Sequence, residues 1–289
     1  MNIRINNLEK HNIFIRIIRI ITVPLLNHLP SSIIQYFMKK SSKDASTVVV
    51  RGGTTHALEV MYERYRRKLF SRGILQGLSD ILWHHIVSQP KALRNRLKIV
   101  QLIIQNEVVS YIRDQNKDEI SILSIAGGSS RSIIYTLQNI KSDGIHNRVH
   151  VVTIDKDESA LDVGRGVAKE MGLSDNFEWI HGSARDITSI FPSRKFDIIE
   201  IVGLLDYFNV DRATRLLISS YKLMNIGGHI IIANVIPNSE KPFVYKTGWP
   251  LMYYRQPNEV ENLLSSSGFD RCDIIIEPMK VHCVCVAKK

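Results

Sequence analysis

The spacing of apolar residues changes near Glu119. Before this point apolar side chains recur every three or four positions, which predicts helices over residues 12–23, 56–70, 74–87 and 90–112. We expect Pro24 to end the first helix and the polar residues 39–46 to form a loop. The pattern therefore predicts an N-terminal helical region over residues 1–118.

Short, β-branched apolar runs alternate with helical stretches over residues 119–289. The runs that we expect to be buried strands cover residues 120–126, 148–154, 176–180, 196–202 and 229–235. This alternation predicts an α/β domain with a mostly parallel sheet and helices on both faces. In such a sheet ligands bind beyond the carboxyl ends of the strands.

A loop of small residues follows the first of these strands, where residues 124–131 read SIAGGSSR. Small side chains let the backbone approach a ligand closely, and the next helix offers free N–H groups. Any tight strand-to-helix turn can use glycine, however, and the Gly-x-Gly-x-x-Gly fingerprint is absent.

An acidic residue ends the second strand. Asp155 lies 27 positions beyond Gly128 and can accept hydrogen bonds from both hydroxyls of a ribose. Asp157 has an ordinary structural explanation, because it can cap the helix that begins near Glu158. Asp155 has no equally good one, so we assign it to a ligand.

Together these segments resemble the class I S-adenosylmethionine (SAM)-dependent methyltransferases over roughly residues 119–289. The matching segments follow the order of the family's motifs and cover residues 122–132, Asp155, residues 181–186, 196–203 and 224–229, and a closing antiparallel pair from Gly268. The resemblance implies a Rossmann-like sheet of seven strands and SAM as cofactor. It places the cofactor-binding role on Ala126, Gly127, Gly128, Ser129, Ser130, Arg131, Asp155, Lys156, Ser183, Ala184, Arg185 and Gly203.

Two departures from the family pattern concern the glycine loop. Ser124 replaces the usual acidic residue, and Gly128-Ser129-Ser130 replaces the usual Gly-x-Gly. Arg131 can meet the methionine carboxylate of SAM or a carboxylate of the protein surface, and both interpretations stay open.

The candidate acceptor site lies between residues 203–207 and 249–255. Their GLLDY and WPLMYYR sequences resemble a bacterial methyltransferase subgroup, some of whose members are linked to methyl esters of hydroxy fatty acids. We expect catalytic roles for Asp206, Tyr207, Tyr254 and Arg255. Asp206 can orient the acceptor, take up a proton or cap the next helix, while Arg255 can bind an anionic acceptor or pair with Glu259.

Charge is concentrated in the helical region. Of a net charge of +10, residues 1–118 contain 19 Lys and Arg against 8 Asp and Glu, and the rest contain 19 against 20. Such a region can contact nucleic acid, acidic lipid or an acidic substrate. We expect a basic cluster either to form a solvent-exposed face or to contact an anionic ligand; it comprises Arg64, Arg66, Arg67 and Lys68. The helix at residues 12–23 packs on the catalytic domain or lies on a membrane or a protein partner.

Other features narrow the setting. No apolar run reaches the roughly 20 residues of a membrane-spanning helix. Cys272, Cys283 and Cys285 show no metal-binding or paired spacing, and His181, His229 and His282 have no metal-ligand spacing, so we expect a cytoplasmic protein without a metal. Three functions remain: a methyltransferase for a small or lipid-like acceptor, an RNA methyltransferase, which we favour less, and a catalytically silent partner subunit.

Overall fold

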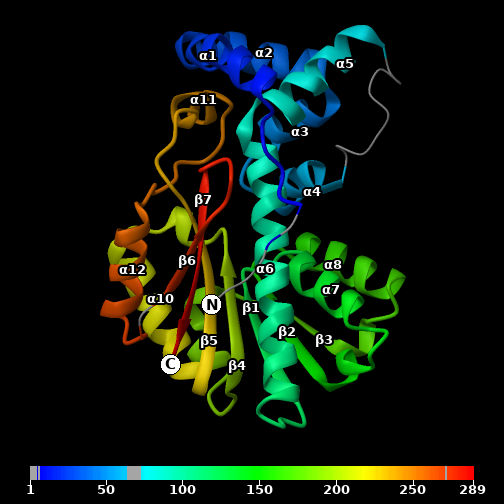
Figure 1. The fold of residues 1–289 in the computed structure, drawn as a ribbon, viewed down its shortest axis with the longest axis vertical. Coiled ribbons are helices and arrows are strands. Elements are labelled where there is room, and N and C mark those ends of the chain that lie inside the picture. Colours follow the sequence, from blue (N-terminus) through cyan, green and yellow to red (C-terminus); the bar gives the residue numbers. More distant parts are fainter. Residues whose placement is uncertain (1–4, 6, 64–72, 271) are drawn as a thin grey trace.

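The computed structural model describes the chain except for residues 1–4, 6, 64–72 and 271. Figure 1 shows a sheet domain with a helical cap above it. The cap contains α1 (Ile13–His28), α2 (Ser31–Ser41), α3 (Lys43–Val50), α4 (Thr55–Glu63), α5 (Ile74–Ile81) and the π-helix Leu82–Ile86. The long helix α6 (Ser88–Arg113) leads from the cap to the sheet.

Seven strands form one sheet in the order β3-β2-β1-β4-β5-β7-β6. They are β1 (Ile120–Ile125), β2 (Val149–Asp155), β3 (Phe177–His181), β4 (Phe196–Val202), β5 (Met224–Val235), β6 (Asp273–Ile276) and β7 (His282–Lys288). Strands β1 to β5 pair in parallel, and β7 is antiparallel to both neighbours. The predicted Rossmann-like fold class is confirmed.

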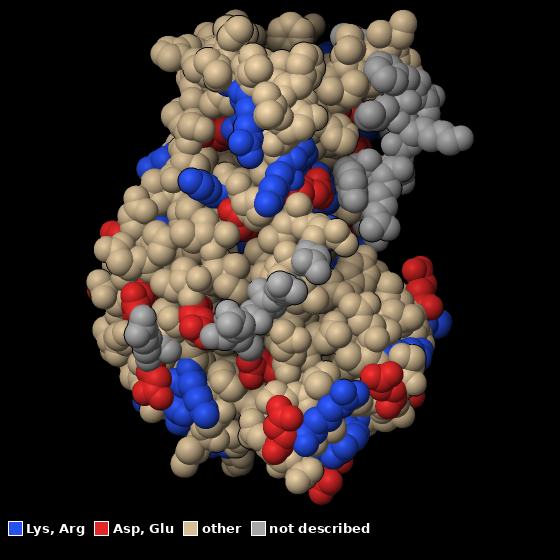
Figure 2. All heavy atoms as spheres, viewed as in Figure 1, with Lys and Arg blue, Asp and Glu red and all other residues tan. Residues whose placement is uncertain are grey.

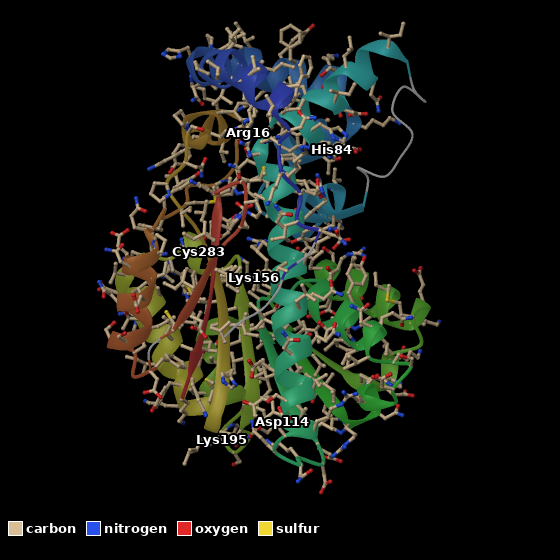
Figure 3. The ribbon with its side chains drawn as sticks, in the orientation of Figure 1. Arg16, His84, Asp114, Lys156, Lys195 and Cys283 are labelled. Carbon is tan, nitrogen blue, oxygen red and sulfur yellow. The ribbon has the colours of Figure 1, made fainter. Side chains whose placement is uncertain are left out.

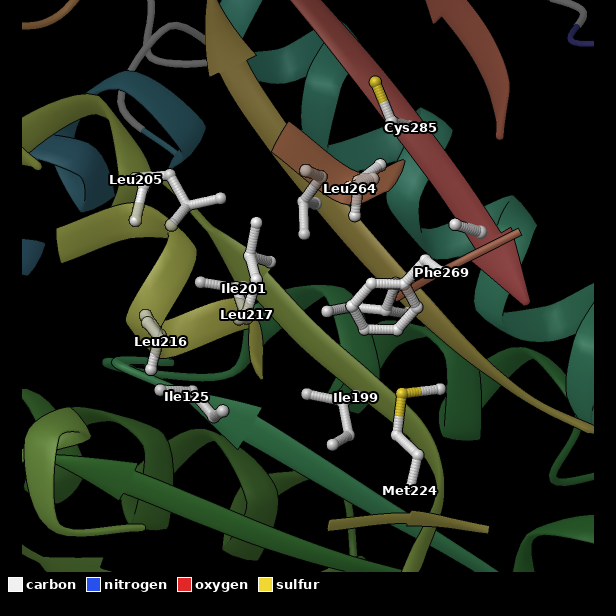
Figure 4. Packing of buried hydrophobic residues seen from close by; sticks show 14 of the residues in the cluster. Ile125, Ile199, Ile201, Leu205, Leu216, Leu217, Met224, Leu264, Phe269 and Cys285 are labelled. Carbon is white, nitrogen blue, oxygen red and sulfur yellow. The ribbon is translucent and has the colours of Figure 1, made fainter. Parts of the chain in front are cut away.

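Helices cover both faces of the sheet. The helices that follow the strands are α7 (Arg131–Asn139), α8 (Glu158–Glu170), α9 (Ile187–Ile190), α10 (Val210–Leu223), α11 (Lys241–Lys246) and α12 (Pro257–Ser266). Figure 4 shows Leu216, Leu217 and Leu264 packed on Ile199 and Ile201 of β4. This apolar packing fixes the strand whose end carries the candidate acceptor site.

Helix α6 packs into the opposite face of the sheet. Ile99, Ile103 and Val108 belong to the same buried cluster as Ile120 and Ile122 of β1. By packing, α6 is therefore part of the sheet domain, although the sequence analysis places it in the region 1–118.

The cap differs from the sequence prediction in two places. Helix α1 continues through Pro24, and its last turn is anchored by Asn27, whose amide nitrogen donates to the Ser239 carbonyl (2.7 Å). The expected loop at residues 39–46 contains the end of α2 and the first half of α3, because the Ser42 side chain caps α3 by accepting from the Asp44 and Ala45 amides. Serine followed by an acid is also a helix-start signal, which the loop prediction overlooked.

The basic cluster Arg64, Arg66, Arg67 and Lys68 lies outside the described residues. Among the residues that are described, no single helix has the length and apolar content to cross a bilayer. Helices α1 and α2 reach that level only when taken together, and the chain bends by 116° between them.

Candidate active site

The glycine loop and Asp155 form one hydrogen-bonded unit at the carboxyl ends of β1 and β2. The Asp155 carboxylate accepts from the Gly128 amide and from the Asp157 amide, each at 2.9 Å. Ala126, Gly128 and Ser130 adopt left-handed backbone conformations, with φ of 52°, 53° and 48°. Such a backbone is costly for Ala and Ser. The loop therefore keeps a strained shape that Asp155 helps to fix.

A second carboxylate lies under the loop, and the sequence analysis missed it. Glu200 of β4 pairs in register with Ser124 of β1. Its carboxylate accepts from the hydroxyls of Ser124 (2.7 Å) and Ser132 (2.6 Å), and burial raises its pKa. A charged residue within the apolar run FDIIEIV was the available signal. Glu200 thus places an acidic side chain beneath the loop, where Ser124 has none.

Helix α4 of the cap lies directly against the glycine loop. Glu59 accepts hydrogen bonds from Ser129 (2.7 Å) and from Nε of Arg131 (2.6 Å). A Cβ atom on Gly128 would lie 2.5 Å from the Thr55 hydroxyl, so only glycine fits beneath the helix. The cap therefore closes over the part of the loop that the sequence assigns to the cofactor.

The remaining cofactor candidates lie at the end of β3 and around Asp155. Ser183 caps a short turn and accepts from the Arg185 amide at 3.2 Å. The neighbouring Gly182 amide donates to the Asp155 carbonyl (2.9 Å). Figure 3 labels Lys156, which lines the large cavity described next. Ser183, Ala184 and Arg185 line neither of the two cavities at the glycine loop.

A cavity of about 450 Å³ opens at the carboxyl ends of β1, β2 and β4. Its floor includes Ala126, Asp155, Lys156 and Gly203, and the cap supplies its roof. Most of the remaining lining is apolar, with Leu58, Met61, Leu93, Phe208, Phe243 and Trp249 among the contributors. The two segments expected to hold the acceptor, residues 203–207 and 249–255, thus both contribute to this space between the cap and the sheet. A smaller cavity of about 70 Å³ adjoins the glycine loop and is lined by Glu59, Arg131 and Glu200.

Four buried polar atoms belong to residues that line the large cavity and form no hydrogen bond with any described residue. They are Nε of Arg96, Nδ1 of His282, Nε2 of Gln89 and Nε1 of Trp83. Buried polar groups normally have partners, and the absence of one costs about 1–3 kcal/mol per group. Three of the four are obligatory donors. The wall of the cavity therefore contains three buried donors that have no partner among the described residues.

Arg96 is the main charge of this cavity and was not a sequence candidate. Its side chain reaches from α6 to Gly203, where a Cβ atom would lie 3.7 Å from both terminal guanidinium nitrogens. The residue is 3% exposed. Burial, followed by the charge of Arg96, holds the pKa of His282 well below its usual value. A neutral imidazole and a guanidinium therefore lie close together in the wall of the cavity.

Asp206 and Tyr207 line the cavity as predicted. Burial raises the pKa of Asp206 to about 6, opposed by the charge of Arg96 and by a hydrogen bond from the Val235 amide (2.7 Å). Burial raises the pKa of Tyr207 to about 12, and its hydroxyl accepts from Trp249 Nε1 (3.0 Å). Asp206 is therefore mostly ionised at neutral pH and becomes protonated as the pH falls through about 6.

Arg255 and Tyr254 do not line the cavity. The Arg255 guanidinium donates to the Leu205 carbonyl (2.9 Å), to Asn234 Oδ1 (2.8 Å) and to the Phe208 carbonyl. The residue is 5% exposed, so it is neither a pocket group nor a surface partner of Glu259. Its contacts instead hold the loop that carries Asp206 and Tyr207.

A doubly wound sheet with a glycine loop, an acid at the end of β2 and a cavity over β4 defines a nucleotide-cofactor enzyme of the Rossmann-like class. The family model described as a methyltransferase domain matches residues 122–228. The ubiquinone/menaquinone biosynthesis C-methyltransferase UbiE of Brucella anthropi is 23% identical over 196 residues, covering 67% of this chain and 68% of that protein. UbiE of Brucella canis matches over 158 residues, so the chain spans 55% of that relative.

Solved structures share the fold at low sequence identity. A possible exported protein from Bordetella parapertussis gives a TM-score of 0.67 at 14% identity, covering 95% of this chain and 94% of that one. An O-methyltransferase family 2 protein from Planctomyces limnophilus, in complex with apigenin, gives 0.52 at 12% identity, covering 99% and 100%. Residues 122–228 therefore match a methyltransferase domain, and together with the UbiE relatives this match supports a SAM-dependent methyltransferase.

Proposed function

We propose that this enzyme transfers the methyl group of SAM to an acidic oxygen atom of an apolar small molecule. The observation that carries the proposal is the large cavity, which has a largely apolar lining, contains Arg96 and Asp206, and opens on Gly203 and Asp155. An oxygen that carries or develops negative charge would pair with Arg96. An apolar acceptor is compatible with two of the similar proteins. The Planctomyces protein was solved in complex with apigenin, and UbiE is named for ubiquinone and menaquinone biosynthesis.

On the cofactor side, two carboxylates fit the two ends of SAM. Asp155 accepts hydrogen bonds at the end of β2, where a ribose would lie, and Glu200 lies below the glycine loop, where the methionine ammonium group would lie. Arg131 and the α7 N-terminus would hold the methionine carboxylate, with Ala126, Gly127, Gly128, Ser129 and Ser130 forming the loop. Lys156, Ser183, Ala184 and Arg185 remain candidates for the adenosine end, and Gly203 leaves room beside the methyl group.

On the acceptor side, Arg96 and Asp206 would have different roles. When bound, SAM supplies an electrophilic methyl group. Arg96 would bind and orient the acceptor oxygen and stabilise its negative charge. For a hydroxyl acceptor, Asp206 would take up the proton, since a pKa of about 6 leaves it ionised at pH 7. Tyr207 would shape the site through Trp249, while Tyr254 and Arg255 would support it from outside.

The test is a kinetic comparison on the full chain. Purified enzyme with labelled SAM is offered apolar carboxylic acids and phenols together with the matching amines, and the methylated product is identified by its mass. We expect the acids or phenols to be methylated and the amines not. Arg96→Met should raise the acceptor KM about tenfold or more while the Kd for SAM stays within twofold. Arg96→Lys, which keeps the charge, should be intermediate.

Methylation of amines alone would contradict the proposal. So would unchanged acceptor kinetics in a folded Arg96→Met enzyme. If Arg96→Met does not fold, the proposal is still tested by the acceptor KM of Arg96→Lys and by whether acids and phenols or amines are methylated.

The setting of the enzyme is part of this proposal. The cap encloses the acceptor site, which favours a small or lipid-like acceptor over RNA. All three cysteines are free and buried, which supports a cytoplasmic location. We assign a peripheral contact with a membrane or a protein to the N-terminal helices.

A further inference from the structure

Helix α1 turns Arg19 toward the protein and most of its apolar side chains toward solvent. Arg19 donates to Glu240 and to the Ile86 carbonyl, both at 2.5 Å. Val23 is the buried residue of this helix. The exposed residues include Ile13, Phe14, Ile17, Ile20, Ile21 and Leu25, each 56–76% exposed. A surface helix of a globular protein normally has the reverse arrangement.

The same apolar surface continues onto two further helices. Tyr36 and Phe37 of α2 are each 61% exposed, and Ile74 and Leu78 of α5 are exposed as well. Figure 1 places α1, α2 and α5 at the upper end of the molecule, and Figure 2 shows that end almost without charged side chains. We call these residues of α1, α2 and α5 the apolar end. A contiguous apolar surface of this kind marks an interaction site.

A recess with three lysines lies where α2 ends and α3 begins. Lys39, Lys40 and Lys43 line it together with Ser42, Ser46, Thr47 and Gln76, around a volume of about 570 Å³. Ammonium and hydroxyl groups are donors that suit phosphate oxygens. Because α2 contacts α5 and carries both Phe37 and Lys39, this basic recess adjoins the apolar end.

We propose that the apolar end docks on the surface of a bilayer that contains anionic lipids. Isoleucine and phenylalanine side chains would enter the boundary between headgroups and acyl chains, while the lysines of the recess would meet lipid phosphates. Charge complementarity favours this occupant over a second copy of the chain. A twofold contact through the apolar end would bring two lysine recesses close together, whereas an anionic surface attracts them.

The proposal goes beyond the methyl-transfer reaction and does not depend on the identity of the acceptor. The bend of 116° between α1 and α2 fits helices that lie on a surface. The membrane would then hold the cap, with the cofactor loop on the side of the cap that faces the sheet.

The experiment measures co-sedimentation of the full chain with vesicles of phosphatidylcholine, with and without phosphatidylglycerol. The first variant replaces Phe14, Ile17 and Ile21 by Ser, and its matched control is Ile226→Ser, which removes an apolar side chain that is 94% exposed in the turn of β5. The second replaces Lys39, Lys40 and Lys43 by Gln. Calorimetry with SAM confirms that each variant is folded.

We expect the wild type and the Ile226 control to bind the anionic vesicles alike, and the triple Ser variant to bind about tenfold or more weakly. The Gln variant should bind anionic vesicles no better than neutral ones. Failure of the wild type to bind, or equal binding by all variants, would overturn the proposal. It would also be overturned by a dimer in light scattering that the triple Ser variant dissociates.

Discussion

Replacing Arg255 by Ala should destabilise the enzyme rather than impair acceptor binding directly. The guanidinium is 5% exposed and donates to two carbonyls and one side-chain amide oxygen around the loop after β4. A hydrogen bond from a charged donor contributes about 1.5–3 kcal/mol, but the desolvation of the guanidinium offsets part of the sum. A net loss of roughly 4 kcal/mol follows, which for a chain of this size lowers Tm by about 10 °C.

The assay is thermal unfolding by circular dichroism, with SAM binding measured well below the transition. Arg215→Ala, an exposed arginine on α10, is the matched control and should shift Tm by no more than about 2 °C. Arg255→Lys should lie between the two, since one ammonium group cannot reach three acceptors arranged around a planar fork. A Tm close to wild type in Arg255→Ala, combined with a raised acceptor KM, would refute the reasoning and restore a pocket role.

Asp155→Ala should lower the affinity for SAM at least about tenfold, because the ribose contacts and the contact with the Gly128 amide are lost together. Calorimetry measures this affinity, and the control Asp162→Ala on α8 should bind SAM as the wild type does. Glu59→Gln should raise the affinity for SAM about fivefold, or roughly 1 kcal/mol, because it weakens the ion pair that holds Arg131. A lower affinity would show instead that Glu59 contributes to the cofactor site. The raised pKa of Asp206 means that its protonated form is favoured in the folded state, so its stabilising effect is complete below about pH 4 and is lost as the pH rises through about 6. Between these pH values, denaturant unfolding should show that the free energy of unfolding of the wild type falls by roughly 3 kcal/mol relative to that of Asp206→Asn. A difference between the two proteins that does not change with pH would contradict the assignment.

Local patterns were sufficient to predict the five parallel strands, whereas the antiparallel pair β6 and β7 was implied by the family resemblance. The expected strand over residues 196–202 coincides with β4, and Asp155 lies at the end of β2 as predicted. Both predictions depend on short apolar runs and a neighbouring turn, which the sequence displays directly. The capping signal at Ser42 was equally local but was outweighed by the polar composition around it.

The acceptor site depended on contacts between distant segments, which one sequence does not reveal. Arg96 lies among other basic residues of a helix, and only the docking of α6 on the sheet buries it beside Gly203. Glu200 gains its meaning from its register with Ser124, 76 positions earlier. Arg255 lies near the predicted site but points away from the cavity, because the segment between α11 and α12 directs its side chain toward Leu205 and Phe208.

The continuity of α6 determines where this chain could be recombined with a relative. One end of the helix carries Leu93 and Arg96 at the acceptor cavity, and the other carries Val108 and Tyr111 in the core of the sheet. A chimaera joined after residue 118 would import a foreign helix into that core. A junction between Val87 and Ser88 would exchange the cap helices, with Val48, Leu58, Met61 and Trp83 of the cavity lining, while leaving the native α6 on the sheet. Leu93 and Arg96 would stay with the sheet domain, so a complete exchange of the cavity lining would also require substitutions at the start of α6.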